Sequence, residues 1–129
     1  MIDRVLKKIT LTSRYHREKI REYIRAEAVA GHVLDVGANF YNKGQYHGFF
    51  ERVTTLNLAP QKGVEIDVIG SAYALPFEDC TFDAVLCTEM IEHLDTPQQA
   101  IDEMYRVLKP GGKVLLSTPF VMPLHDVPG

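Results

Sequence analysis

An acidic residue and a histidine follow the most apolar stretch of the chain. Glu89 and His93 lie four positions apart, and Thr88 joins them to the apolar run 82–87. If this segment is helical, side chains at positions i and i+4 face the same way, so the pair could remove a proton from a bound molecule. The same spacing suits two metal ligands, but no third ligand is evident and we predict no metal. Glu89 and His93 are therefore the candidate catalytic residues.

A second polar group interrupts an apolar segment nearer the start of the chain. Asp35 stands among Val33, Leu34 and Val36. Burying an unpaired carboxylate is costly, so we expect this one to have a hydrogen-bonding role. Gly37 follows, and glycine lets the backbone turn and approach a ligand closely.

The elements that must position these residues can be read from hydrophobic patterning. Apolar runs predict strands over 33–36, 54–58, 64–69, 82–87 and 113–118, whereas residues 38–48 have no clear period and are predicted to be mostly loop. Strands alternating with helical or irregular crossovers favour a parallel sheet in an open α/β fold. Ligands of such sheets bind at the carboxyl ends of the strands. We therefore expect residues 37–42, 57–60 and 88–93 to converge on one cleft.

Two helices are predicted from apolar stripes and capping residues. The first covers 13–29 with Ser13 as N-cap, and its stripe is Ile20, Tyr23, Ile24 and Ala28. The second covers 97–108, with Thr96 as N-cap, Pro97 in the first position and Gln99 completing a capping box. Its predicted buried stripe is Ile101, Met104, Tyr105 and Leu108.

Length and composition fit one globular domain over residues 1–129. The chain is 46% hydrophobic and 24% charged, and no apolar run approaches the roughly 20 residues of a membrane span. No secretory signal is recognised, and Cys80 and Cys87 have no metal-like spacing, so we expect reduced thiols and a cytoplasmic location. The net charge of −3 is uneven, because residues 1–30 carry +4. We interpret this basic segment as a solvated helix, with nucleic acid or anionic lipid as the alternative partners.

Three landmarks in order resemble the class I S-adenosylmethionine (SAM)-dependent methyltransferases, specifically the type 11 group. They are Val33-Leu34-Asp35-Val36-Gly37, then Leu75-Pro76-Phe77 with Thr81-Phe82-Asp83-Ala84-Val85-Leu86-Cys87, then Leu108-Lys109-Pro110-Gly111-Gly112-Lys113-Val114. The resemblance covers residues 31–124, which we take as the cofactor-binding core. It implies a Rossmann-like sheet of strand order 3-2-1-4-5 with flanking helices. It also implies methyl transfer from SAM to a small-molecule acceptor, with S-adenosylhomocysteine as product.

The resemblance also implies which residues meet the cofactor. Asp35 would brace the glycine loop near the methionine end, and the full predicted set is Asp35, Gly37, Asn39, Asn57, Leu58, Ser71, Ala72, Leu75 and Thr88. The chain departs from the family at three of these positions. Asn39 replaces a second glycine, and we expect it to preserve the turn because Asn tolerates left-handed geometry. Asn57 stands where an acid that binds the ribose is usual, so ribose binding is expected to be weakened but not abolished, since charge-assisted hydrogen bonds are stronger than neutral ones. Ser71 stands where an acid near the adenine amino group is usual, and its hydroxyl can still accept a hydrogen bond.

The resemblance further implies elements beyond the fifth strand. Family members normally continue with an antiparallel strand pair, which this sequence lacks, so the fifth strand is expected to be an open edge. Such an edge invites pairing with another chain, and we predict a homodimer formed through it. His125 follows this strand and is a candidate substrate contact, or part of a frayed tail.

Three other functions compete with a methyltransferase. The departures from the family at Asn39, Asn57 and Ser71 suit a degenerate methyltransferase fold that acts as a binding or assembly module without catalysis. A Rossmann-type oxidoreductase would need Gly-x-Gly-x-x-Gly after the first strand, which is absent. A nucleic-acid methyltransferase would fit the basic N-terminus, but Thr88-Glu89-Met90-Ile91 stands where a base-flipping Asn-Pro-Pro-Tyr motif is expected.

Overall fold

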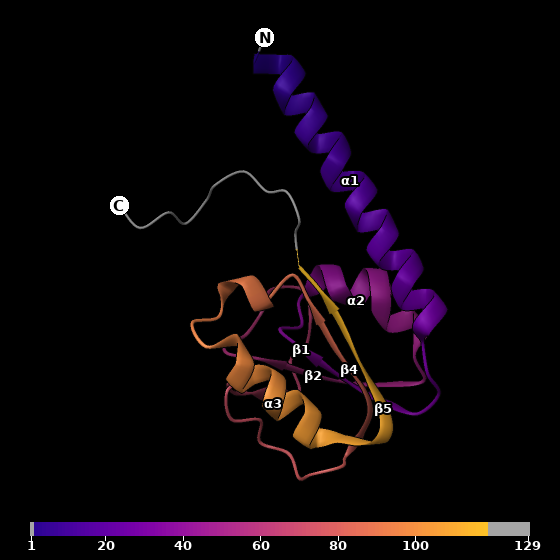
Figure 1. The fold of residues 1–129 in the computed structure, drawn as a ribbon, viewed down its shortest axis with the longest axis vertical. Helices are drawn as coiled ribbons and strands as arrows, with labels where there is room; N and C mark the ends of the chain where they lie inside the picture. The colour runs from indigo at the N-terminus through magenta and orange to yellow at the C-terminus, as the bar shows by residue number, and fades with distance from the viewer. Residues whose placement is uncertain (1, 119–129) are drawn as a thin grey trace.

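A parallel sheet forms the centre of the molecule. The structure is a computed structural model that describes residues 2–118, and the side chains of residues 14–118. Within that range five strands, β1 (His32–Val36), β2 (Arg52–Asn57), β3 (Val68–Ile69), β4 (Phe82–Thr88) and β5 (Leu108–Ser117), lie in the order β3-β2-β1-β4-β5. All neighbouring strands are parallel. The predicted fold class and strand order are confirmed (Figure 1).

Helices cover both faces of the sheet. On one face, α1 (Ile2–Glu27) and α2 (Phe40–Tyr46) supply Ile20, Ile24 and Tyr46 to a buried apolar cluster. On the other, α3 (Pro97–Val107) packs against the sheet through Met104 and Val107 (Figure 1). The central strand β1 is thus buried on both sides, as a continuous apolar strand requires. No helix in the described part of the chain is both long and apolar enough to cross a membrane.

The first helix is longer than its sequence pattern predicts. α1 begins at Ile2, so Ser13 lies inside the helix and does not cap it. Ile20 and Ile24 are buried as expected, but the Tyr23 side chain faces solvent. The helix is followed by Gly31, whose φ of +104° and contact with Asp83 leave no room for a side chain. Asp83 accepts a 2.7 Å hydrogen bond from the His32 backbone N–H and so anchors the start of β1.

The segment predicted as loop is mostly helical. It contains α2 and a following 3-10 turn, η1 (His47–Phe49). The side chain of Asn39 caps α2 by accepting a 2.9 Å hydrogen bond from the Asn42 N–H. The prediction of a loop was wrong because the buried face of this short helix consists of Asn42 and Tyr46. An asparagine and a tyrosine do not produce the apolar periodicity by which a helix is recognised in a sequence.

The third helix and its flanking strands differ from prediction in detail. The Thr96 side chain makes no cap hydrogen bond, and Gln99 instead donates to the Tyr73 carbonyl oxygen at 3.2 Å, so the capping box does not form. Ala100, Met104 and Val107 make the buried face, whereas Tyr105 is 64% exposed. β5 starts at Leu108, directly after the helix, rather than at residue 113.

The third strand is only two residues long, because an aspartate side chain takes over its hydrogen bonds. Asp67 Oδ2 accepts from the Thr55 N–H at 2.9 Å and from the Thr55 hydroxyl at 3.1 Å. The Asp67 N–H in turn donates to Thr55 Oγ1 at 2.8 Å. These bonds replace the backbone ladder that the predicted strand 64–69 would have made, and pairing begins only at Val68.

Candidate active site

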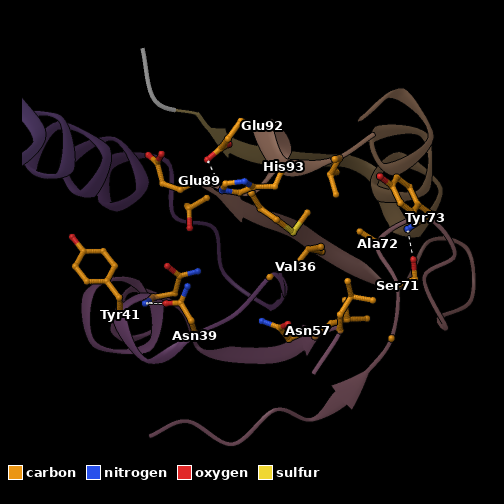
Figure 2. Close-up of a pocket in the computed structure, with 18 of the residues that line it drawn as sticks. Val36, Asn39, Tyr41, Asn57, Ser71, Ala72, Tyr73, Glu89, Glu92 and His93 are labelled. Carbon is orange, nitrogen blue, oxygen red and sulfur yellow. Dashed lines mark hydrogen bonds and ion pairs between the residues drawn. The ribbon is translucent and has the colours of Figure 1, made fainter. Parts of the chain in front are cut away.

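One cleft gathers most of the residues that the sequence singles out. It has a volume of about 550 Å³ and lies at the carboxyl ends of β1, β2 and β4, where ligands of such sheets bind (Figure 2). Its lining includes the predicted residues Gly37, Asn39, Asn57, Leu58, Ser71, Ala72, Thr88, Glu89 and His93. Two predicted residues lie elsewhere: Leu75 is in the core against α3, and Asp35 is buried behind the glycine turn.

The turn after β1 is built around Gly37. Its φ of +82° is a conformation that favours glycine, and a Cβ at this position would come within 2.7 Å of the Met90 sulfur. The N–H groups of Gly37 and Ala38 both donate to the Leu56 carbonyl oxygen, at 2.9 and 3.1 Å. These bonds fix the turn to the end of β2, so the backbone faces the cleft in one defined position.

Two of the three asparagines that line the cleft, Asn39 and Asn57, have structural roles that the sequence did not show. Asn39 is extended, with φ −150° and ψ 176°, so the expectation that it adopts a left-handed turn was wrong; it caps α2 instead. Asn57 donates from Nδ2 to the Ala38 carbonyl oxygen at 2.8 Å, and its Oδ1 accepts from the Ala59 N–H at 3.3 Å. An aspartate could accept the bond from the Ala59 N–H but could not donate to the Ala38 carbonyl oxygen. The amide at position 57 therefore ties the glycine turn to the next strand.

Asp35 is paired with a histidine that the sequence did not reveal as its partner. His47 Nε2 donates to Asp35 Oδ2 at 2.6 Å, and the aspartate side chain is completely buried. Burial raises the pKa of Asp35, and the proximity of His47 and Asn42 partly offsets this effect. Asp35 Oδ1 and Asn42 Nδ2 are buried without a hydrogen-bond partner among the described residues. Because Asn42 lines the cleft, its amide is a donor available to a ligand.

Glu89 stands in a strained conformation at the end of β4. Its φ is +52°, which is uncommon for a residue other than glycine. Glu89 Oε1 lies 3.1 Å from His16 Nε2 and 3.4 Å from the Ser117 hydroxyl. Sequence spacing carries no signal for His16, because this residue lies on α1, 73 residues before Glu89.

His93 is oriented differently from the prediction. The segment after β4 is a 3-10 turn, η2 (Ile91–His93), and Glu89 precedes it, so no α-helix places the two side chains on one face. His93 Nε2 instead lies 3.7 Å from Glu92 Oε1, and Figure 2 shows both side chains beside the cleft. Within the described residues, no group of three His, Cys, Asp or Glu side chains is arranged to hold a metal ion.

The wall of the cleft that includes Ser71, Ala72 and Leu58 has few reactive side chains. Ser71 Oγ accepts a 3.1 Å hydrogen bond from the Tyr73 N–H and closes a local turn (Figure 2). Ala72 is buried beside it, and Leu58 is 73% exposed at the rim.

Thr88 Oγ1, at the end of β4, is buried without a hydrogen-bond partner among the described residues. A hydroxyl of this kind at the end of a central strand is suited to hydrogen-bond a molecule in the cleft.

Comparisons with known proteins agree with this geometry. A family model described as a methyltransferase domain matches residues 31–116, well over half of the chain. A ubiquinone/menaquinone biosynthesis C-methyltransferase of Ruegeria sp. is 38% identical in a 98-residue alignment that covers 68% of this chain and 39% of the relative. A ubiquinone biosynthesis O-methyltransferase of Xanthomonas axonopodis pv. citri is 35% identical over 113 residues, 75% of this chain and 47% of the relative.

A solved structure supports the same assignment. A candidate methyltransferase of Bacillus halodurans aligns with a TM-score of 0.63 and 27% identity, over 74% of this chain and 49% of that one. This chain thus spans less than half the length of these three proteins. The residues that the family model matches include the glycine turn, β1 to β4 and all of β5 except its last residue. The chain therefore belongs to the methyltransferase domain family.

Proposed function

We propose that the cleft binds SAM and that the protein transfers the SAM methyl group to a small-molecule acceptor. The observation that carries this proposal is the fixed Gly37 turn, which faces a cleft of about 550 Å³ next to two unpartnered buried polar groups, Asn42 Nδ2 and Thr88 Oγ1. Buried polar atoms in proteins are almost always satisfied, so this pair fits a bound polar ligand. When bound, SAM supplies an electrophilic methyl group on a sulfonium.

The residues present fit the parts of SAM that the family resemblance assigns to them. The resemblance places Asp35 near the methionine end, and we assign to the methionine carboxylate the neighbouring Asn42 Nδ2, which has no hydrogen-bond partner among the described residues. Among the described residues Asn57 Oδ1 accepts one weak hydrogen bond, at 3.3 Å, so it can also accept a bond from one ribose hydroxyl. Ser71, Ala72 and Leu58 form the wall that we assign to adenine.

Methyl transfer depends mainly on how the acceptor is positioned against the methyl group. In an in-line displacement, the acceptor atom must be held against the methyl group and water excluded, and these effects can account for a large share of the rate. Thr88, Glu89 and His93 line the cleft at the end of β4 and face this space. We assign them to the acceptor side, where a proton is also removed when the acceptor needs it.

We further propose that the acceptor is a hydroxylated aromatic ring. Two relatives are named as quinone-biosynthesis methyltransferases, one acting on carbon and one on oxygen. Tyr41 lines the cleft at the end away from Ser71 and Tyr73 and offers flat apolar surface to such a ring (Figure 2). A non-polymeric acceptor also suits a cleft of this size.

Two finer proposals concern the protein as a whole. β5 pairs only with β4 within residues 2–118, so we keep the proposal that its outer edge pairs with a second copy, which light scattering would test. Cys80 and Cys87 are both free thiols, which is in keeping with a reducing compartment such as the cytoplasm.

The test of the proposed function is formation of S-adenosylhomocysteine from SAM in the presence of a panel of phenols and catechols. We expect product that depends on both the protein and the acceptor, and that falls strongly in a Gly37→Ala variant. Gly44→Ala is the matched control, because a Cβ at Gly44 meets nothing within 4 Å. Absence of acceptor-dependent product together with absence of SAM binding would refute the proposal.

A further inference from the structure

Glu89 is held in place more firmly than a residue that merely lines a cleft. Its backbone is in the left-handed region at φ +52°, which persists only where the surroundings enforce it. The Glu89 N–H donates to the Ser117 carbonyl oxygen at 3.0 Å, and the Ser117 hydroxyl donates to Glu89 Oε1 at 3.4 Å. Two contacts from β5 thus fix both the backbone and the carboxylate. Such strained residues cluster at functional sites.

His16 of α1 completes this arrangement. Its Nε2 lies 3.1 Å from Glu89 Oε1, and both residues line the cleft, with side chains 34% and 37% exposed. A carboxylate can only accept a hydrogen bond, so Nε2 must carry the proton of the neutral imidazole. The lone pair then resides on Nδ1. This is the arrangement in which a carboxylate orients a histidine that acts as a general base.

We propose that His16 is the general base toward a hydroxyl acceptor and that Glu89 is the residue that positions it. This inference rests on the proposed function. The acceptor O–H bond breaks as its proton passes to His16 Nδ1. The oxygen electron pair forms the new bond to the methyl carbon, and the carbon–sulfur bond breaks with its electrons on sulfur, which leaves S-adenosylhomocysteine. Glu89 balances the charge of the imidazolium, and the proton leaves to solvent through the half-exposed ring.

The pair differs from the one that sequence spacing suggested. His93 Nε2 lies near Glu92, at 3.7 Å, and its side chain is half-exposed. Arg17, beside His16 on α1, stacks over the Tyr41 ring at 5.6 Å and also lines the cleft. The basic helix α1 therefore supplies side chains to the site, a role that its sequence pattern did not predict.

A pair of acceptors separates proton removal from other roles. Catechol needs a base near neutral pH, whereas 4-nitrocatechol is already largely ionised there. We expect His16→Gln to slow transfer to catechol by about 100-fold, the scale of general base catalysis, and transfer to 4-nitrocatechol by only a few-fold. Equal slowing with both acceptors would overturn the proposal, because a structural role affects both. His93→Gln is the comparison variant and should slow both acceptors by the same factor.

A second readout needs no turnover. In ¹⁵N-histidine NMR spectra of the full chain, the His16 signal is identified as the one that is missing from the His16→Gln spectrum. This signal should show that the neutral His16 ring is the Nε2–H tautomer. Glu89→Ala should shift the ring toward a mixture of tautomers, and an unchanged tautomer would contradict the pairing. Loss of activity on chelation that Mg²⁺ restores would assign Glu89 to a metal and overturn the proposal.

The failure of this inference is distinguishable from failure of the proposed function. If the wild-type chain methylates neither catechol nor 4-nitrocatechol, the role of His16 toward a phenolic acceptor is refuted. SAM binding, measured separately without acceptor, would still establish the cofactor site. If SAM does not bind, the proposed function itself fails.

Discussion

The buried pair of Asp35 and His47 yields a prediction about stability that can be worked from the structure. Asp35 is completely buried, and the 2.6 Å bond from His47 is the only hydrogen bond found for its carboxylate among the described residues. His47→Leu keeps a side chain of similar size but removes the donor. Breaking a buried pair by removing one partner costs about 3 kcal/mol or more, because the remaining charge is left unpaired. For a domain of this size, that loss lowers the melting temperature by roughly 12 °C.

The cost should depend on pH with a definite sign. Burial raises the pKa of Asp35 in the folded state above its ordinary value, so the folded chain holds this proton more tightly than the unfolded chain. Asp35 therefore lowers stability as pH rises from the ordinary aspartate pKa through the raised one. Without His47 the raised pKa climbs further. The difference between variant and wild type should be largest at pH 7 and should shrink in acid, where Asp35 is protonated in both.

The assay is urea unfolding of both proteins at pH 7 and at two more acidic values. Lys113→Gln is the control, because it breaks a half-exposed 2.8 Å ion pair with Glu27, and such pairs contribute about 1 kcal/mol or less. A loss under about 1 kcal/mol for His47→Leu at pH 7 would refute the reasoning. So would a loss that stays constant as the pH falls.

Three further predictions follow from individual contacts. Asn57→Asp should lower the stability of the ligand-free chain by about 1–2 kcal/mol, because it removes the donor to the Ala38 carbonyl oxygen; an unchanged urea midpoint would contradict this. Arg106→Gln should cost about 2 kcal/mol, since Arg106 donates to the Leu75 and Phe77 carbonyl oxygens; thermal unfolding would measure it, and a shift as small as that of Lys113→Gln would count against it. Burial raises the pKa of the Cys87 thiol to about 12, so at pH 8 a thiol reagent should label only the exposed Cys80 until urea is added; labelling of both in the folded chain would show that Cys87 is accessible.

The sheet was predictable because its strands carry local signals. Continuous apolar runs mark the buried strands, which the parallel topology covers on both faces. The sequence failed where polar side chains replace backbone bonds or apolar contacts. Asp67 shortens β3 by taking over its ladder, and α2 has a buried face that includes an asparagine and a tyrosine. Hydrophobic periodicity cannot register either arrangement.

The site was predictable only in part, for a related reason. The residues at strand ends, such as Gly37 and Thr88, were found because the topology of a parallel sheet brings strand ends together. His16 and His47 were missed as partners because each meets a carboxylate on a different element, and sequence spacing carries no information about such contacts. Asn57 and Asn39 looked like weakened cofactor ligands, but Asn57 donates a bond that an acid could not donate, and Asn39 accepts a capping bond that a glycine could not accept.

Calorimetric titration with SAM tests the central claim most directly. The purified chain should bind SAM at one saturable site, and S-adenosylhomocysteine should compete for that site. Gly37→Ala should weaken binding at least tenfold, because its φ of +82° and its 2.7 Å approach to Met90 leave no room for a methyl group, whereas Gly44→Ala should bind normally. Absence of binding by a folded wild-type chain at millimolar SAM would contradict the account, as would equal binding by the two variants.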